Sequence, residues 1–388
     1  MSVSRSPNPS RRVFRLTSLI ASGSIVVAAA IGCTTSSSGG SSADPGGDLS
    51  AAQQQCVDKA NNYLETRGLL PDALPPELTP LSKPPTKGLT FTYVFAGAVP
   101  TSANAAQKLV DAAPVVGWTG KKLAFDGSVE DANRKVMDAV SNSDIVTIAG
   151  IPEAALQGPI AAAKDRGVLL MIDSAEPPQS VPGWGATPLG GDFWTKVGEP
   201  AAYASLQATN CEGSTAVFGL PVPAMRQLGE GIEAVIKREC AECGVSYTDL
   251  AFSDIGAPSA ANAVTSKLQA DPSIKLAFFA VGDLANGIEP ALKQAGIDVK
   301  IGGALASTPN LAALKQDRNS FWLGFPPDMT AWITLDTAAR ALDSGQPTVG
   351  NHYPVPIFTK DNVDSTDEVL PYPSDYQAQF EELWKVSP

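Results

Sequence analysis

The fold is decided by the stretch LAFFAVGDLANGIEPALKQAG, residues 276–296. Its first six residues are an apolar run that ends abruptly at a glycine and Asp283. A helical pattern follows, in which Leu284, Ile288 and Leu292 recur every fourth residue. The stretch therefore predicts a strand, a tight turn and a helix. Asp283 then lies at the carboxyl end of the strand, where open α/β sheets bind ligands, but it is equally a suitable N-cap for the helix. Both roles remain open.

Working outward, strands and helices alternate from residue 89 onward. We expect strands at 89–95, 122–126, 144–149, 168–173, 194–198, 215–220, 247–252, 275–281, 300–304, 321–324 and 353–358. We expect helices at 103–115, 129–140, 153–166, 200–210, 223–240, 259–269, 284–295, 310–316 and 330–342. Such alternation gives parallel sheets through right-handed crossovers. The pattern restarts at 215, so the predicted fold class is α/β with two doubly wound parallel-sheet lobes and a crevice between them.

Composition narrows the possible functions. The 388 residues carry a net charge of −12, which argues against a nucleic-acid partner because phosphates need a basic surface. The single histidine, His352, nearly excludes Cys/His zinc sites and histidine-based triads. We find no metal-ligand spacing, phosphate-binding loop or dinucleotide fingerprint. The sequence therefore predicts no enzyme activity, no metal and no cofactor.

The N-terminus has the pattern of an export signal. Residues 1–32 combine a basic start, which contains Arg11 and Arg12, with a short apolar stretch of small residues. The segment Ser-Arg-Arg-Val-Phe resembles the twin-arginine export motif, although a plain basic segment would look the same. Ala-Ile-Gly-Cys, which ends at Cys33, resembles a bacterial lipobox. That resemblance implies cleavage before Cys33, lipidation of its thiol and a lipid anchor in the cell membrane.

The next segment, 33–88, connects this anchor to the α/β body. Residues 34–50 are rich in Ser, Gly and Asp and predict a flexible tether. Residues 50–68 read as an amphipathic helix, and 69–88 contain six prolines, which predict a stiff, extended linker.

Several short motifs follow one another in a specific order. They are VGW at 116–118, FDG at 125–127, IDS at 172–174, VGE at 197–199, RQLGEG at 226–231, VGD at 281–283, GG at 302–303 and IFTKDNV at 357–363. In this order and spacing they resemble the type I periplasmic (solute-binding) proteins of ABC importers, the ribose- and galactose-binding class. The resemblance covers residues 89–363.

The resemblance implies two lobes joined by a hinge of three crossings, near 198–199, 324–327 and 355–359. The first lobe would comprise 89–198 plus 326–354 and the second 199–325 plus 355–363. Residues 364–388 would form a C-terminal extension that packs on one of the two lobes. It also implies a monomer that closes on a small polar ligand, a sugar in the first instance, and delivers it to an ABC permease.

Five side chains are candidates for ligand contact on the strength of this resemblance. Asp173 follows the fourth strand and Asp283 is its counterpart in the second lobe; both match acids that accept bonds from sugar hydroxyls. Arg226 matches a ligand arginine, with pairing to the glutamate one turn later as the alternative. Phe325 falls at the second crossing, where it could stack on a ligand or pack in the hinge, and Asp254 follows a strand end.

The turn after the first strand departs from the family pattern. Sugar binders often carry Asn and Phe there, whereas this chain reads FAGAVPT over 95–101. Stacking could instead come from Trp184, Trp194 or Phe193. The ligand class therefore stays open between a sugar and a nucleoside, polyol or signalling molecule. A sensory receptor module and an exported enzyme on the same fold remain rival functions.

Four cysteines besides Cys33 are available for disulfides, the default in an exported protein. They are Cys56, Cys211, Cys240 and Cys243, which allow three pairings. Cys211 precedes the first strand of the second lobe, and Cys240 and Cys243 close the helix after it, so these three should cluster. We hypothesise that Cys56 supplies the fourth thiol and docks its helix on the second lobe, with the other bridge inside the cluster.

Overall fold

A computed structural model of the chain describes residues 49–173, 185–350 and 353–386. The expected signal sequence, Cys33 and most of the tether lie outside the described residues, as do Trp184 and His352. No helix in the described ranges combines the length and apolar character needed to cross a membrane.

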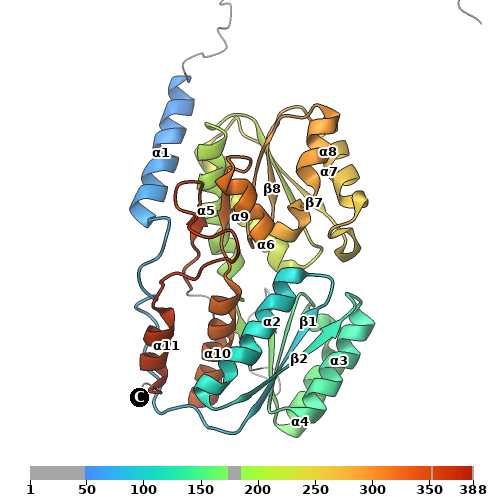
Figure 1. Cartoon of the computed structure of the whole chain (residues 1–388), viewed down its shortest axis with the longest axis vertical. Helices are drawn as coiled ribbons and strands as arrows, with labels where there is room; N and C mark the ends of the chain where they lie inside the picture. The colour runs from blue at the N-terminus through green and yellow to red at the C-terminus, as the bar shows by residue number, and fades with distance from the viewer. Residues whose placement is uncertain (1–48, 174–184, 351–352, 387–388) are drawn as a thin grey trace, which may run out of the picture. The chain divides into compact units, whose positions relative to one another are not determined.

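Lobe 1 is built on a six-stranded parallel sheet in the order β11-β5-β4-β3-β1-β2. Its strands are β1 (Thr90–Ala96), β2 (Thr119–Phe125), β3 (Ile145–Ala149), β4 (Leu169–Asp173), β5 (Ala186–Pro188) and β11 (Thr348–Gly350). The helices of this lobe, visible in Figure 1, are α2 (Pro100–Ala112), α3 (Val129–Asn142), α4 (Gln157–Arg166) and α10 (Pro327–Ser344).

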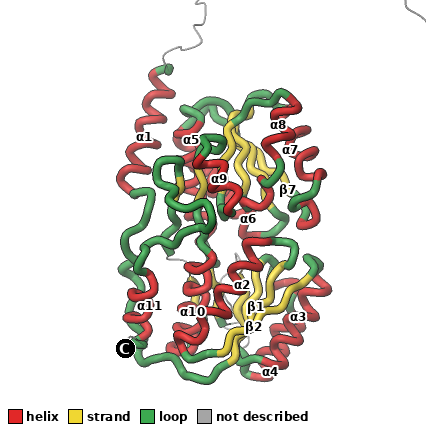
Figure 2. Tube along the Cα trace, viewed as in Figure 1, coloured by secondary structure: helices red, strands yellow, loops and turns green. Residues whose placement is uncertain are grey.

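Lobe 2 repeats the plan with the order β12-β10-β9-β8-β6-β7, in which only β12 is antiparallel to its neighbour. Its strands are β6 (Ser214–Gly219), β7 (Val245–Asp249), β8 (Ile274–Phe279), β9 (Lys300–Gly303), β10 (Phe321–Leu323) and β12 (Ile357–Phe358). Its helices are α5 (Phe193–Ala208), α6 (Pro223–Glu239), α7 (Pro258–Ala270), α8 (Ile288–Ala295) and α9 (Thr308–Lys315), and Figure 2 shows strands and helices grouped in this way. The expected fold class of two parallel-sheet lobes is confirmed.

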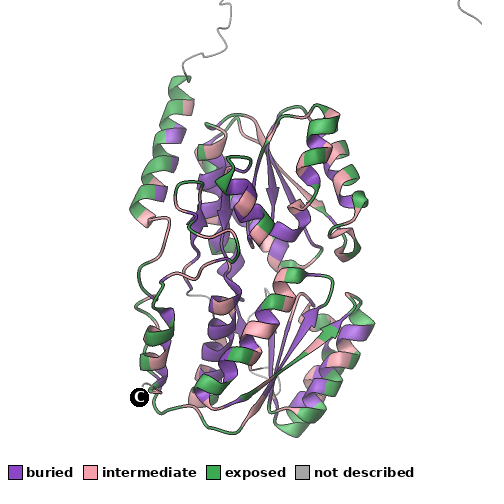
Figure 3. Cartoon of the chain, viewed as in Figure 1, coloured by how far each residue is buried: buried purple, intermediate pink, exposed green. Residues whose placement is uncertain are grey.

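The central strands are buried on both faces, as parallel sheets require. In β8, for example, Phe278 and Phe279 point to opposite faces and both are fully buried. Figure 3 shows the same pattern along the strands and on the helix faces that cover them. Continuous apolar runs therefore gave reliable strand predictions, because neither face needs polar residues.

The first crossing differs from expectation. Residues 194–198 were expected as a strand, but they lie inside α5, which packs mainly against α6 of lobe 2. The chain thus leaves lobe 1 between β5 and α5, before the expected crossing at 198–199. Although proline removes a backbone hydrogen bond, the helix continues through Pro200 because its apolar positions keep helical spacing and bury one face against lobe 2. The other two passages occur between β10 and α10 and between β11 and β12.

Glycines of the VGE and RQLGEG motifs allow α5 and α6 to pack closely. A Cβ added to Gly198 on α5 would lie 2.6 Å from the Cα of Gly231 on α6, and one added to Gly231 would lie 2.4 Å from a backbone carbonyl oxygen of α5. The two backbones touch at these positions, so only glycine fits. The VGE and RQLGEG motifs therefore mark close helix packing.

Residues 49–88, the N-terminal arm, bind both lobes. Helix α1 (Ala51–Arg67) packs on α5, and the disulfide Cys56–Cys211 joins it to lobe 2, while Cys240 pairs with Cys243. This pairing confirms the docking hypothesis. The Pro-rich part of the arm runs along lobe 1, where the Trp118 Nε1–H donates to the carbonyl oxygen of Thr86 at 2.8 Å.

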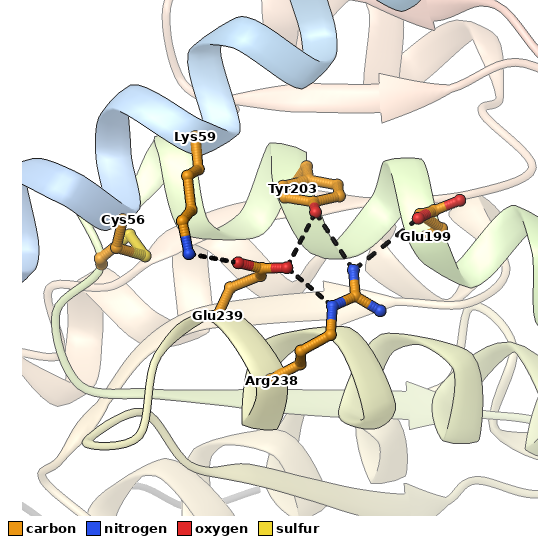
Figure 4. A network of polar contacts seen from close by, with 7 residues as sticks. Cys56, Lys59, Glu199, Tyr203, Arg238 and Glu239 are labelled. Atoms are coloured by element: carbon orange, nitrogen blue, oxygen red, sulfur yellow. Dashed lines mark hydrogen bonds and ion pairs between the residues drawn. A yellow bond between two sulfur atoms is a disulfide. The ribbon is translucent and has the colours of Figure 1, made fainter.

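A polar network reinforces the α1 contact (Figure 4). The carboxylate of Glu239 on α6 accepts from Lys59 of α1 at 3.1 Å, from the Tyr203 hydroxyl at 3.1 Å and from Arg238 Nε at 2.7 Å. These bonds, from Arg238 above all, hold the pKa of Glu239 below its usual range. Tyr63 of α1 also stacks on Tyr203, with ring centroids 4.0 Å apart.

The C-terminal extension packs on lobe 1 through α11 (Tyr376–Trp384). Trp384 stacks on Trp332 of α10 and donates its indole N–H to Asp336 at 2.7 Å. Asp336 is fully buried and also accepts from Arg340 and the Tyr353 hydroxyl. This buried acid fastens the end of the chain to α10.

Candidate ligand-binding cleft

A cavity of about 150 Å³ lies between the two lobes, at the carboxyl ends of strands from both sheets. The position is the one that open α/β sheets use for ligands. Its lining is mostly apolar, with polar side chains from Tyr93, Thr101, Ser102, Asp173, Trp194 and Thr330. The apolar side chains include Val99, Ile151, Leu189, Leu220, Val222, Met225, Phe252, Val281, Leu305 and Phe325.

Asp173 is the acidic group of this cavity. It ends β4, and its Oδ1 atom is buried without a hydrogen-bond partner in the described part of the chain. Burial raises the pKa of this carboxyl well above its ordinary value, because the charged form loses its hydration. Tyr93 of β1 lies nearby, and burial together with the charge of Asp173 raises its phenol pKa. A ligand that donates a hydrogen bond or brings a positive charge would satisfy Asp173.

An aromatic wall, made of Trp194 and Phe325, also borders the cavity. The rings of Trp194 and Phe325 stack with centroids 5.1 Å apart, and Phe193 meets Phe325 edge-on at 6.1 Å. The indole N–H of Trp194 is buried without a described acceptor. Phe325 thus packs against these two rings and also borders the cavity, and its stacking on a ligand stays a prediction.

Phe252 is a lining residue that the sequence argument missed. It lies in a 3₁₀ turn, Phe252–Asp254, instead of at a strand end. A Cβ added to Gly127 of lobe 1 would lie 3.6 Å from its Cβ, so Phe252 reaches across from lobe 2 to lobe 1. Gly127 has a φ of +97°, which favours glycine by itself, so the FDG motif at 125–127 carried no signal for Phe252.

Asp283 makes a different contact from the one expected. It does not line the cavity, and it does not cap α8, whose N-cap position is Gly287. Its Oδ2 accepts from the backbone N–H of Thr101 at 3.1 Å and from the Thr101 hydroxyl at 2.9 Å. Thr101 lies in the first turn of α2, whose own N-cap residue, Val99, makes no side-chain cap.

Asp283 therefore caps a helix of lobe 1 from lobe 2. A carboxylate at a helix N-terminus satisfies free N–H groups and interacts favourably with the helix dipole. The side chain is nearly inaccessible to solvent, and burial raises its pKa, while the two bonds from Thr101 act in the opposite direction. We call this contact the cross-lobe cap.

Arg226 and Asp254 lie outside the cavity. The Arg226 guanidinium pairs with Asp249 at 2.6 Å and lies 3.9 Å from the centre of the Tyr247 ring. Arg226 therefore neither lines the cavity nor forms the alternative ion pair with Glu230. Asp254 accepts from the backbone N–H of Ala251 and the hydroxyl of Ser259, both at 2.7 Å, and so stabilises its own turn. Of the five candidates, the structure brings only Asp173 and Phe325 together at the cavity.

Comparison with known proteins agrees with this architecture. The family model described as a periplasmic binding protein domain matches residues 99–347. The chain belongs to this periplasmic binding protein family. Among curated proteins, none matches the sequence.

Solved structures support the type I form of this fold. The chain is similar to a periplasmic ribose ABC transporter protein from Conexibacter woesei (16% identity, TM-score 0.59, 73% of this chain and 95% of that chain). A glucose-galactose binding protein from Geobacillus stearothermophilus has 14% identity and a TM-score of 0.60, with 72% and 100% covered. An ABC transporter solute binding protein from Mycobacterium smegmatis with bound glycerol has 17% identity and a TM-score of 0.58, with 71% and 96% covered.

Proposed function

We propose that this protein is the extracytoplasmic substrate-binding component of an ABC importer. The two lobes close on a small ligand and present the closed form to the permease. The observation that carries this proposal is the cavity at the carboxyl ends of both sheets, bordered by Asp173 and the aromatic wall. Membership of the periplasmic binding protein family supports it.

Export and membrane anchoring are part of the proposal. The expected signal sequence and Cys33 would place the folded lobes outside the cytoplasm on a lipid anchor, and two disulfides are consistent with an oxidising compartment. Cys33→Ala tests the anchor. We expect the variant to lose lipid labelling and appear in the medium, whereas wild type stays in the membrane fraction. Wild type that remains unlabelled would refute the anchor without touching the cleft.

Sugars are the first ligand class to test, because the names of several similar structures describe sugar transport or sugar binding. Thermal-shift screening against sugars, polyols and nucleosides should find a ligand that raises the melting temperature. Small-angle scattering with that ligand should show a more compact molecule, as lobe closure requires. Failure of every ligand class to do either would refute the substrate-binding role. We expect a monomer by size-exclusion chromatography with light scattering.

A further inference from the structure

The cavity contains an acid without a counter-charge. Asp173 Oδ1 is buried and has no hydrogen-bond partner among the described residues, and no Lys, Arg or His is present in the described lining. Segment 174–184, which follows directly in the chain, contains no basic residue in its sequence. A buried, charged oxygen without a hydrogen-bond donor is costly, so Oδ1 of ionised Asp173 favours a ligand that brings positive charge.

The rest of the cavity lining suits a ligand with an apolar body and a positively charged end. Tyr93, Trp194, Phe252 and Phe325 contribute aromatic rings, whose faces attract cations. Most other lining side chains are aliphatic. A ligand body in contact with them gains from apolar burial without needing further hydrogen bonds.

A free sugar matches this lining poorly. Each ring hydroxyl needs a partner, and a buried hydroxyl without one weakens binding. The charged side chains expected to serve the hydroxyls, Arg226, Asp254 and Asp283, are all engaged elsewhere. Size points the same way, since a cavity of about 150 Å³ is comparable to an engineered apolar cavity that accommodates benzene.

We infer that the cleft binds a small organic ammonium ion, with its N–H groups on Asp173 and its apolar body against the aromatic wall. This inference rests on the proposed function and names the ligand class of the same cleft. The Trp194 indole N–H is free to donate a hydrogen bond to an acceptor on the ligand. The ammonium assignment does not require such an acceptor.

Benzylamine and benzyl alcohol provide a matched pair of probes, because they differ essentially in the charged end. We expect wild-type protein to bind benzylamine at least about ten-fold more tightly than benzyl alcohol in calorimetric titration, as charge-assisted hydrogen bonds imply. Asp173→Asn should bring the two affinities within about two-fold. Asp165→Asn, at an exposed acid of α4 outside the cavity, serves as the control and should leave the ratio unchanged.

Each outcome is decisive. Equal wild-type affinity for both probes, or no benzylamine binding, overturns the inference even if Asp173→Asn fails to fold. A sugar such as ribose that binds and closes the lobes while benzylamine does not would overturn the ammonium assignment and leave the proposed function intact. Failure of both the probes and the ligand panel overturns both.

Discussion

The cross-lobe cap gives a sharp prediction about lobe closure. Asp283→Ala removes both hydrogen bonds to Thr101 and leaves the first turn of α2 without a side-chain cap. Loss of an N-cap costs about 0.5–2 kcal/mol. The bonds join different lobes, so we expect that loss to fall on the closed state relative to the open one. Apparent ligand affinity should then fall by roughly 2- to 30-fold, because every 1.4 kcal/mol is ten-fold.

Thr101→Val supplies the matched control. It removes the hydroxyl donor but keeps the backbone N–H bond to Asp283, so its loss should be about 0.5–1.5 kcal/mol and smaller than that of Asp283→Ala. Because both changes act on one contact, Thr101→Val should have little further effect in the Asp283→Ala background. Calorimetric titration and small-angle scattering of the four proteins measure affinity and closure. Unchanged affinity in Asp283→Ala would refute the role in closure, whereas complete loss would restore the original expectation of direct ligand contact.

Three further predictions concern stability. Asp173→Asn should raise the melting temperature at neutral pH, and its advantage should vanish as pH falls toward the unfolded aspartate value of about 3.9. The raised folded pKa of Asp173 means that its stabilising proton is lost as pH rises. A pH-independent difference would contradict this. Replacing Cys56 and Cys211 together by Ser should cost up to about 5 kcal/mol in denaturant unfolding, from the chain entropy of a bridge across 155 residues; an unchanged midpoint would show that the other arm contacts suffice. Gly231→Ala should cost about 1–3 kcal/mol by overpacking α5, while Gly158→Ala, in open space on α4, should stabilise by up to about 1 kcal/mol. Equal effects at the two glycines would refute the close-packing argument.

Most of the fold could be predicted because the central strands of parallel sheets are apolar and their crossover helices are amphipathic. The passage from lobe 1 to lobe 2 could not, because Pro200 looks like a helix break in isolation. The hydrogen bond that Pro200 removes from the helix is outweighed by burial of the α5 face against α6, and that contact is visible only in the folded structure. Short edge strands such as β11, three residues long, lack any pattern of their own.

The site was harder to predict because some of its charged side chains form hydrogen bonds and ion pairs with residues that are distant in sequence. Arg226 lies 23 residues from its partner Asp249. The Asp283 partner, Thr101, is 182 residues away and donates through both its backbone N–H and its hydroxyl. Phe252 became visible as a lining residue only when its ring was placed against a glycine of the other lobe. Strand ends fix where a side chain lies but not which neighbour it meets.

The two aspartates at strand ends show why that neighbour determines function. Asp173 ends β4 and Asp283 follows β8, and burial raises the pKa of both. Asp283 has two donors from Thr101, so its carboxylate is already satisfied when the lobes meet. Asp173 Oδ1 has none in the described residues. Since an unmet buried acceptor is what an incoming donor relieves, ligand binding should depend on Asp173, and the strength of closure on Asp283. Exchanging the two effects, with Asp283→Asn abolishing probe selectivity and Asp173→Asn only weakening closure, would refute this division.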